Sequence, residues 1–295
     1  MAVGLFFNLP LNASFLIGVV FISSSIAVII PSLESNRLLD TRLGKSIVIS
    51  IILEDITSLV LLSLLLQTSN QITVLPLPLY YIFLLSALVG IRIALPKLKN
   101  LFISRWTNLF KKKKEDLFQQ ELRLTFAILI GIVVIFELLG LHAIIGGFFA
   151  GLLLSEILQS EILKAKFKTL SYGIFIPIFF IMVGAQTNFA VLFETKNILL
   201  FTFVLITASI GSKFLSGWIG GLLSGFNARQ SMLIGAATTP QLSTTLAVVF
   251  TAFDQGYFEE SVLAAMILLS GITTLVGPLV ISTLGRKLVE EKDVK

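Results

Sequence analysis

The chain has 295 residues, of which 56% are hydrophobic and 13% are charged, and its mean hydropathy is +0.97. Soluble domains carry about 25% charged residues, so this composition excludes an ordinary soluble protein and predicts an all-α, polytopic integral membrane protein. The lack of cysteine excludes disulfides and thiolate chemistry, and the single histidine, His142, excludes a histidine-rich metal site. The net charge of +5 does not indicate nucleic-acid binding, because the basic residues lie mainly between apolar segments.

Nine apolar segments are predicted to cross the bilayer, since about 20 residues of helix span its hydrocarbon core. The predicted spans are residues 12–32, 46–67, 77–96, 122–140, 142–156, 171–190, 197–224, 228–252 and 260–284. The basic segment 97–121 is predicted to be a cytoplasmic linker, because positive charge accumulates on the cytoplasmic side of membrane proteins. Residues 1–295 then form one transmembrane domain in the plasma (inner) membrane, with the N-terminus outside and the C-terminus cytoplasmic.

Two of the predicted spans contain sequences that interrupt a helix at mid-depth. The first has the run Ser23, Ser24 and Ser25 ahead of Pro31, and the eighth has Thr238 and Thr239 ahead of Pro240. Proline removes a backbone donor, and hydroxyl side chains can satisfy the backbone groups released at such a break. The predicted topology gives these two spans opposite directions, which is typical of inverted-repeat transporters with a midplane substrate site. Two ordinary proline kinks are the alternative.

The second and seventh predicted spans carry charges at mid-depth. Glu54 and Asp55 are adjacent in the second span, and Lys213 lies near the centre of the seventh. Each such charge costs roughly 2.5–3.5 kcal/mol on insertion scales, and charges at this depth mark ion or proton paths. Because a lone ammonium needs a partner there, the sequence predicts a carboxylate–ammonium pair that joins the two spans. A salt bridge that only holds the helices together is the alternative, although the second acid would then have no partner.

In their order and spacing, these motifs resemble the monovalent cation:proton antiporter superfamily, in particular its branch with Kef-type and sodium/hydrogen exchanger domains. The resemblance covers nearly the whole chain and is carried by residues 22–31, 52–56, 145–156, 175–184, 211–213 and 236–240. It implies an inverted-repeat antiporter fold with two broken helices, in which Asp55 binds a cation and a proton in alternation. It also implies that Glu54 pairs with Lys213. Ser24 and Ser25 stand where related proteins often carry a charged ligand, so hydroxyl or carbonyl oxygens must serve there.

The activity implied by this resemblance is exchange of Na⁺ or K⁺ for H⁺ by alternating access, without enzyme activity and without a cofactor. Full-length members have twelve or thirteen spans, so three N-terminal spans are expected to be absent from this chain, and a homodimer is expected where they are present. The expected partners are monovalent cations, protons and the lipid bilayer, and not nucleic acid. A truncated fragment that does not transport, an accessory membrane subunit and an organic-anion carrier of similar fold are the alternatives.

Overall fold

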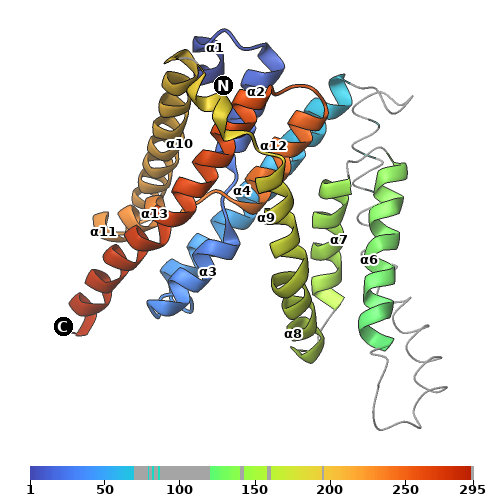
Figure 1. Ribbon diagram of the computed structural model, residues 1–295. Coiled ribbons are helices and arrows are strands. Elements are labelled where there is room, and N and C mark those ends of the chain that lie inside the picture. Colours follow the sequence, from blue (N-terminus) through green and yellow to red (C-terminus); the bar gives the residue numbers. More distant parts are fainter. Residues whose placement is uncertain are drawn as a thin grey trace. The chain divides into compact units, whose positions relative to one another are not determined.

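The computed structural model describes residues 1–69, 79, 82, 86, 120–139, 143–157, 161–194 and 196–293, and the regular structure of these residues is helical throughout (Figure 1). The predicted span 77–96 and the predicted linker 97–121 lie almost entirely outside the described residues, as does His142. In chain order the elements are α1 (Ala2–Phe6), α2 (Leu11–Ile22), α3 (Ile26–Ser35), α4 (Arg42–Ser69), α6 (Gln120–Leu138), α7 (Ala143–Ile157), α8 (Glu161–Leu170), the π-helical turn η1 (Ser171–Phe175), α9 (Ile176–Ala185), the 3₁₀ turn η2 (Phe189–Phe193), α10 (Lys196–Leu223), α11 (Ala228–Ala237), α12 (Ser243–Asp254) and α13 (Glu260–Asp293).

Several of these helices are suited to a bilayer by length and composition. Among the described residues, the five that are long and apolar enough to cross it are Leu11–Ser35, Arg42–Gln67, Glu161–Ala185, Lys196–Leu223 and Glu260–Gly285. Two shorter apolar helices, Ala143–Ser155 and Ser243–Asp254, accompany them. The chain is therefore an all-helical, multi-pass membrane protein.

The chain divides into two compact units, one made of Met1–Leu62 with Gln186–Lys295 and the other of Ser63–Ala185. The first unit has a core in which α3, α4, α11 and α13 bring buried aliphatic side chains together. The members of this core are Ile29, Leu33, Leu38, Leu43, Ile47, Ile51, Leu233, Ile234, Ala237 and Ile281. Because these residues come from both ends of the sequence, burial of their apolar surface holds α3 and α4 against α11 and α13.

The first predicted span is interrupted, but not by its proline. α2 ends at Ile22 and α3 begins at Ile26, and the backbone between them is extended, with φ −66° and ψ 149° at Ser23. The Ser23 hydroxyl donates to the carbonyl of Val20, at 3.1 Å, and so satisfies one acceptor at the end of α2. Pro31 instead lies inside α3 with its side chain exposed, which corrects the expectation that it lines the broken segment. The serine run, rather than the proline, marks the break.

The eighth predicted span is also interrupted, and here the proline lies in the break. α11 ends at Ala237 and α12 begins at Ser243, with Pro240 in the non-helical stretch between them. The hydroxyls of Thr238 and Thr239 both donate to the carbonyl of Gly235, at 3.0 and 2.9 Å, and satisfy the last turn of α11. Proline cannot donate a backbone hydrogen bond and disfavours helix in the residue before it, which explains why α11 stops there.

Two glycines allow the second break to pack closely against its neighbours. A Cβ on Gly235 would overlap the carbonyl oxygen of Phe214 in α10, and a Cβ on Gly277 in α13 would overlap the ring of Pro240. The absence of side chains at these positions therefore lets α10 and α13 approach the backbone of the broken segment, as small residues do in membrane helix packing.

The second unit contains the end of α4 and the helices α6 to α9. α6 packs on α7, and the rings of Phe126 and Phe167 stack at a centroid distance of 4.6 Å between α6 and α8. The elements α8, η1 and α9 follow one another without a gap from Glu161 to Ala185. The helix of the predicted span 171–190 therefore begins earlier and ends earlier than its apolar residues indicate.

Candidate functional site

The two broken segments cross and are bonded directly to each other. The backbone N–H of Ser25 donates to the carbonyl of Pro240 at 2.8 Å, and the hydroxyls of Ser23 and Thr245 are 2.7 Å apart. The Ser24 hydroxyl lies 2.6 Å from the carbonyl of Thr238. Backbone groups that leave a helix inside a membrane protein need such partners, because lipid provides none. The crossing therefore satisfies both breaks at once.

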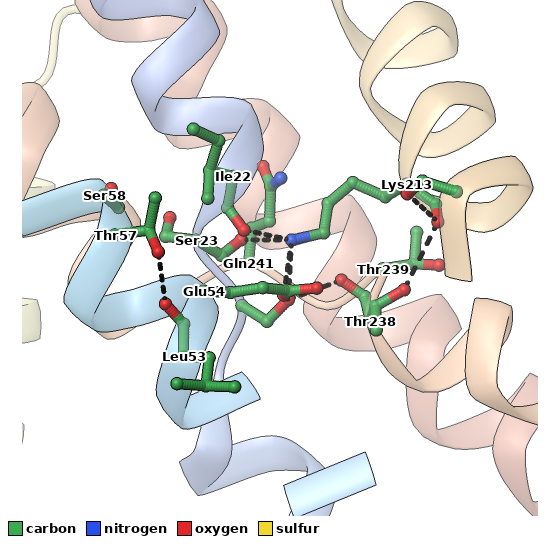
Figure 2. A network of polar contacts seen from close by, with 12 residues as sticks. Ile22, Ser23, Leu53, Glu54, Thr57, Ser58, Lys213, Thr238, Thr239 and Gln241 are labelled. Carbon is green, nitrogen blue, oxygen red and sulfur yellow. Dashed lines mark hydrogen bonds and ion pairs between the residues drawn. The ribbon is translucent and has the colours of Figure 1, made fainter. Parts of the chain in front are cut away.

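Lys213 reaches this crossing from α10 (Figure 2). Lys213 is 4% exposed to solvent. Its Nζ lies 2.7 Å from the carbonyl oxygens of Ile22 and Ser23 and 2.6 Å from the Ser24 hydroxyl. These carbonyls are at the C-terminal end of α2, where a positive charge is favoured by the helix dipole. An ammonium has three hydrogens, and four acceptors surround it, since Glu54 Oε2 also lies within hydrogen-bond distance.

Glu54 supplies the negative charge beside Lys213. Its Oε2 lies 3.1 Å from Lys213 Nζ and 2.5 Å from the Ser24 hydroxyl, and its side chain is 26% exposed to solvent. The structure thus brings together Glu54 and Lys213, the residues expected to form a carboxylate–ammonium pair between α4 and α10. Ser24 contacts both members of the pair and is itself fully buried.

Asp55 differs from its neighbour in burial and in partners. The residue is 4% exposed, and its Oδ1 accepts no hydrogen bond within the part of the chain that the structure describes. The Thr244 side chain, at the start of α12, and the backbone of Ser24 are hydrogen-bonding partners of its carboxylate. A buried carboxylate oxygen without a donor is costly, so it is a position that a cation or a proton can occupy with advantage.

The remaining predicted residues have different surroundings. The Ser25 hydroxyl is buried and has no hydrogen-bond partner among the described residues, so its oxygen is also open to a ligand. Thr238 contributes its carbonyl to the crossing, whereas its hydroxyl and that of Thr239 serve the end of α11. Pro31 takes no part, because it lies within α3.

Gln241 was not expected in the site, yet it is fully buried directly after Pro240. Its backbone N–H donates to the Thr273 hydroxyl at 3.1 Å, and its Oε1 lies 3.4 Å from the Ser209 hydroxyl. Its Nε2 has no acceptor among the described residues. The sequence does hint at a role for Gln241, because an amide side chain is unusual next to a proline in an apolar span. Its hydrogen bond to Thr273 of α13, however, depends on the fold.

The polar groups of the site are oxygen atoms and one ammonium. Across the described residues, no three histidine, cysteine or acidic side chains are grouped so that they could hold a metal ion. Two carboxylates, serine hydroxyls and carbonyls of unwound helix remain, and these are the groups that bind alkali cations and protons in transporters.

An all-helical membrane protein with ionisable side chains buried at the crossing of two interrupted helices has the architecture of an ion-coupled transporter. The chain belongs to the family described as "Sodium/hydrogen exchanger, transmembrane", which residues 1–287 match. It is thus a member of a transporter family and not an enzyme.

Individual relatives agree with this assignment. The chain is 30% identical over 287 residues to the probable Na⁺/H⁺ antiporter 3 of Methanocaldococcus jannaschii, a match that covers 95% of this chain and 70% of the relative. It is 23% identical over 290 residues to a Na⁺/H⁺ antiporter of Enterococcus hirae, covering 95% of this chain and 72% of that protein. It is 27% identical over 142 residues to the Na⁺/H⁺-K⁺ antiporter GerN of Bacillus cereus, covering 48% and 36% of the two chains.

Proposed function

We propose that this chain exchanges Na⁺ or K⁺ for H⁺, with Asp55 binding the cation and the proton in alternation. The observation that supports this proposal most directly is the Asp55 carboxylate, which is 4% exposed and has one oxygen without a partner among the described residues. Membership of the exchanger family and the antiporter names of its relatives support the same activity.

In the proposed reaction, deprotonated Asp55 holds the cation together with oxygen atoms of the crossing. The unpartnered hydroxyl of Ser25 and the backbone carbonyls of the extended segments are suited to complete its coordination. When Asp55 takes up a proton, its carboxyl group becomes neutral and the cation loses its main electrostatic partner. Cation and proton therefore compete for one carboxylate, and this competition couples their movements in opposite directions.

Glu54 and Lys213 have a different role in this proposal. The carboxylate offsets the ammonium, and the ammonium holds the C-terminal carbonyls of α2. A cation that arrives at Asp55 is repelled by Lys213, so the lysine can release its proton when the cation binds and recover it when the cation leaves. The pair would then set the charge moved in each cycle, while Asp55 sets the exchange itself.

The same proposal includes the arrangement in the membrane. We infer an inverted-repeat antiporter fold with nine spans in this chain, a plasma-membrane location and a cytoplasmic C-terminus. The two interrupted helices, α2 with α3 and α11 with α12, support the inverted repeat because their breaks meet at one point. Alternating exposure of that point to the two sides of the membrane would move the ions.

Proteoliposomes that contain a pH-sensitive dye test the proposal. We expect pulses of Na⁺ or K⁺ to drive protons across the membrane, and Asp55→Asn to abolish this flux. Asp254→Asn, a matched change at an exposed aspartate at the end of α12, should leave the flux unchanged. Full cation-driven proton flux in the Asp55→Asn variant would overturn the assignment of the site. No flux in the unaltered chain would favour the accessory or non-transporting alternative.

A further inference from the structure

A cavity of about 510 Å³ lies between α4, α10 and α11, within the first unit. At one end it is lined by Arg42, the first residue of α4, and by Phe226, in the turn between α10 and α11. At the other end it is lined by Glu54 and Thr238. It therefore connects the start of α4 with the crossing of the broken helices.

The wall that α4 contributes to this cavity is mostly polar. Arg42, Ser46, Ser50 and Glu54 all line it, and their spacing of four residues places them on one face of the helix. On the opposite wall, Gly220 of α10 has no side chain, and a Cβ there would meet nothing within 4 Å. The hydroxyl, carboxylate and guanidinium groups of the α4 wall give water hydrogen-bond partners, so a cavity of this size can hold water.

The end of the cavity next to the crossing reaches Glu54 and not Asp55. Glu54 is among the lining residues and its side chain is 26% exposed, whereas Asp55 is 4% exposed and does not line the cavity. The cavity therefore ends at Glu54, which contacts Ser24 and Lys213, and does not reach the unpartnered oxygen of Asp55. A cation that travels along the cavity meets Glu54 first.

The end of the cavity farthest from Glu54 carries the positive charge of Arg42, which is held in place by Phe226. The guanidinium carbon of Arg42 lies 5.4 Å from the centroid of the Phe226 ring, a distance at which the cation is attracted to the ring face. This contact joins α4 to the turn after α10 at the mouth of the cavity. Walls of low dielectric focus the field of such a charge along the water between them.

We propose that this cavity is the passage by which the exchanged cation reaches Glu54, and that Arg42, held on Phe226, is a charge filter at its mouth. The passage rests on the proposed function, whereas the filter is a property of the cavity itself. The guanidinium lowers the local concentration of free cations in the passage and raises that of anions. It therefore sets how much cation is needed to saturate exchange, without contacting the bound ion.

The chain has no cysteine, so single cysteines report on the passage without a prior substitution. Ser50→Cys places a thiol in the passage, and Ser58→Cys places one at a fully buried position of the same helix. We expect membrane-impermeant methanethiosulfonates to modify the first readily and the second very slowly. Modification should be faster from the membrane face at which Arg42 lies. Equal protection of the two cysteines would overturn the passage.

The filter is tested by comparing a cationic with an anionic methanethiosulfonate at Ser50→Cys. Arg42→Glu should raise the ratio of the cationic to the anionic modification rate roughly fivefold in about 10 mM salt, and less at high salt. The reason is that it changes the charge of one side chain by two units at a distance of about 12 Å, eight residues along the helix. Arg37→Glu makes the same change of charge at an exposed arginine that does not line the cavity, and should leave the ratio almost unaltered. Phe226→Leu, which keeps the charge but frees the side chain, should give a smaller rise.

An unchanged ratio in Arg42→Glu, or an equal change in Arg37→Glu, would overturn the filter. Both measurements follow a chemical modification rather than transport, so they give an answer even if the chain exchanges no ions. Conversely, exchange activity combined with a protected Ser50→Cys would refute the passage and leave the proposed function intact.

Discussion

Lys213 and Ser24 lie side by side at the crossing of the broken helices, with 2.6 Å between the ammonium nitrogen and the hydroxyl oxygen. The same hydroxyl lies 2.5 Å from Glu54 Oε2 and 2.6 Å from the carbonyl of Thr238. A hydroxyl has one hydrogen, so it donates to only one of these two acceptors at a time while it accepts from the lysine. Ser24 is therefore the residue on which both the ion pair and the second broken helix depend.

Ser24→Ala should reduce stability more than the loss of one ordinary hydrogen bond. The change removes the one hydroxyl that donates to Glu54 or to the Thr238 carbonyl, and a buried acceptor left unsatisfied costs about 1–3 kcal/mol. Ser58→Ala, which removes a single bond to the carbonyl of Val19, should cost about 0.5–1.5 kcal/mol. Thermal unfolding in detergent compares the two. Equal losses of stability would contradict the central position of Ser24.

Lys213→Met should destabilise the chain strongly, because it leaves the carbonyls of Ile22 and Ser23 and the Glu54 carboxylate without their common donor. Removal of one partner of a buried ion pair costs about 3–5 kcal/mol. The double variant Lys213→Met with Glu54→Gln should recover part of this loss, with a coupling energy of about 1–3 kcal/mol in a double-mutant cycle. Lys196→Met, at an exposed position at the start of α10, is the matched control. Strict additivity of the Lys213 and Glu54 changes would refute the pairing.

Competition at Asp55 predicts how exchange depends on pH. If one proton must leave the carboxylate for one cation to bind, the half-saturating cation concentration rises as pH falls. The rise should approach about tenfold per pH unit in the acidic range and vanish in the alkaline range, where the carboxylate is already free. Initial rates at graded cation concentrations and several pH values measure this slope. A half-saturating concentration that does not change with pH would indicate separate sites for the two ions.

Gly220→Leu should block exchange while leaving the fold intact. A Cβ at Gly220 meets nothing within 4 Å, so the larger side chain has room, and the room it fills is the cavity that ends at Glu54. Gly211→Leu introduces the same side chain on α10, where a Cβ also meets nothing within 4 Å but does not line the cavity. Exchange assays combined with thermal unfolding separate the two effects. Normal exchange in a stable Gly220→Leu variant would show that the ions use another route.

Much of the site follows from the sequence because the membrane limits the possibilities. In an apolar environment Lys213 must find an acid, and only Glu54 and Asp55 have a comparable depth in the predicted spans. The interruption of both spans also follows from local chemistry, since serine and threonine runs can satisfy a broken backbone. The sequence does not tell which proline breaks a helix. Pro240 lies in a break, whereas Pro31 lies inside α3, and the local sequence does not distinguish the two.

Other parts of the site depend on contacts that no local pattern encodes. The pairing of Ser23 with Thr245 joins residues at opposite ends of the chain, and Gln241 meets Ser209 and Thr273 only after three helices have assembled. The cavity is open at Gly220 because this residue has no side chain to fill it. The division between a partly buried Glu54 and a fully buried Asp55, which are neighbours in sequence, likewise arises from the direction in which each side chain leaves α4.

The bonds between Ser25 and Pro240 and between Ser23 and Thr245 restrict how the molecule can move. Pulling the two segments apart would take these amide, carbonyl and hydroxyl groups from their present partners, and a buried polar group left unpaired is costly. The half-helices on either side of the two breaks are thus held together, so that a displacement of one break also displaces the other. In the proposed alternating access, the two breaks would therefore move together rather than one after the other.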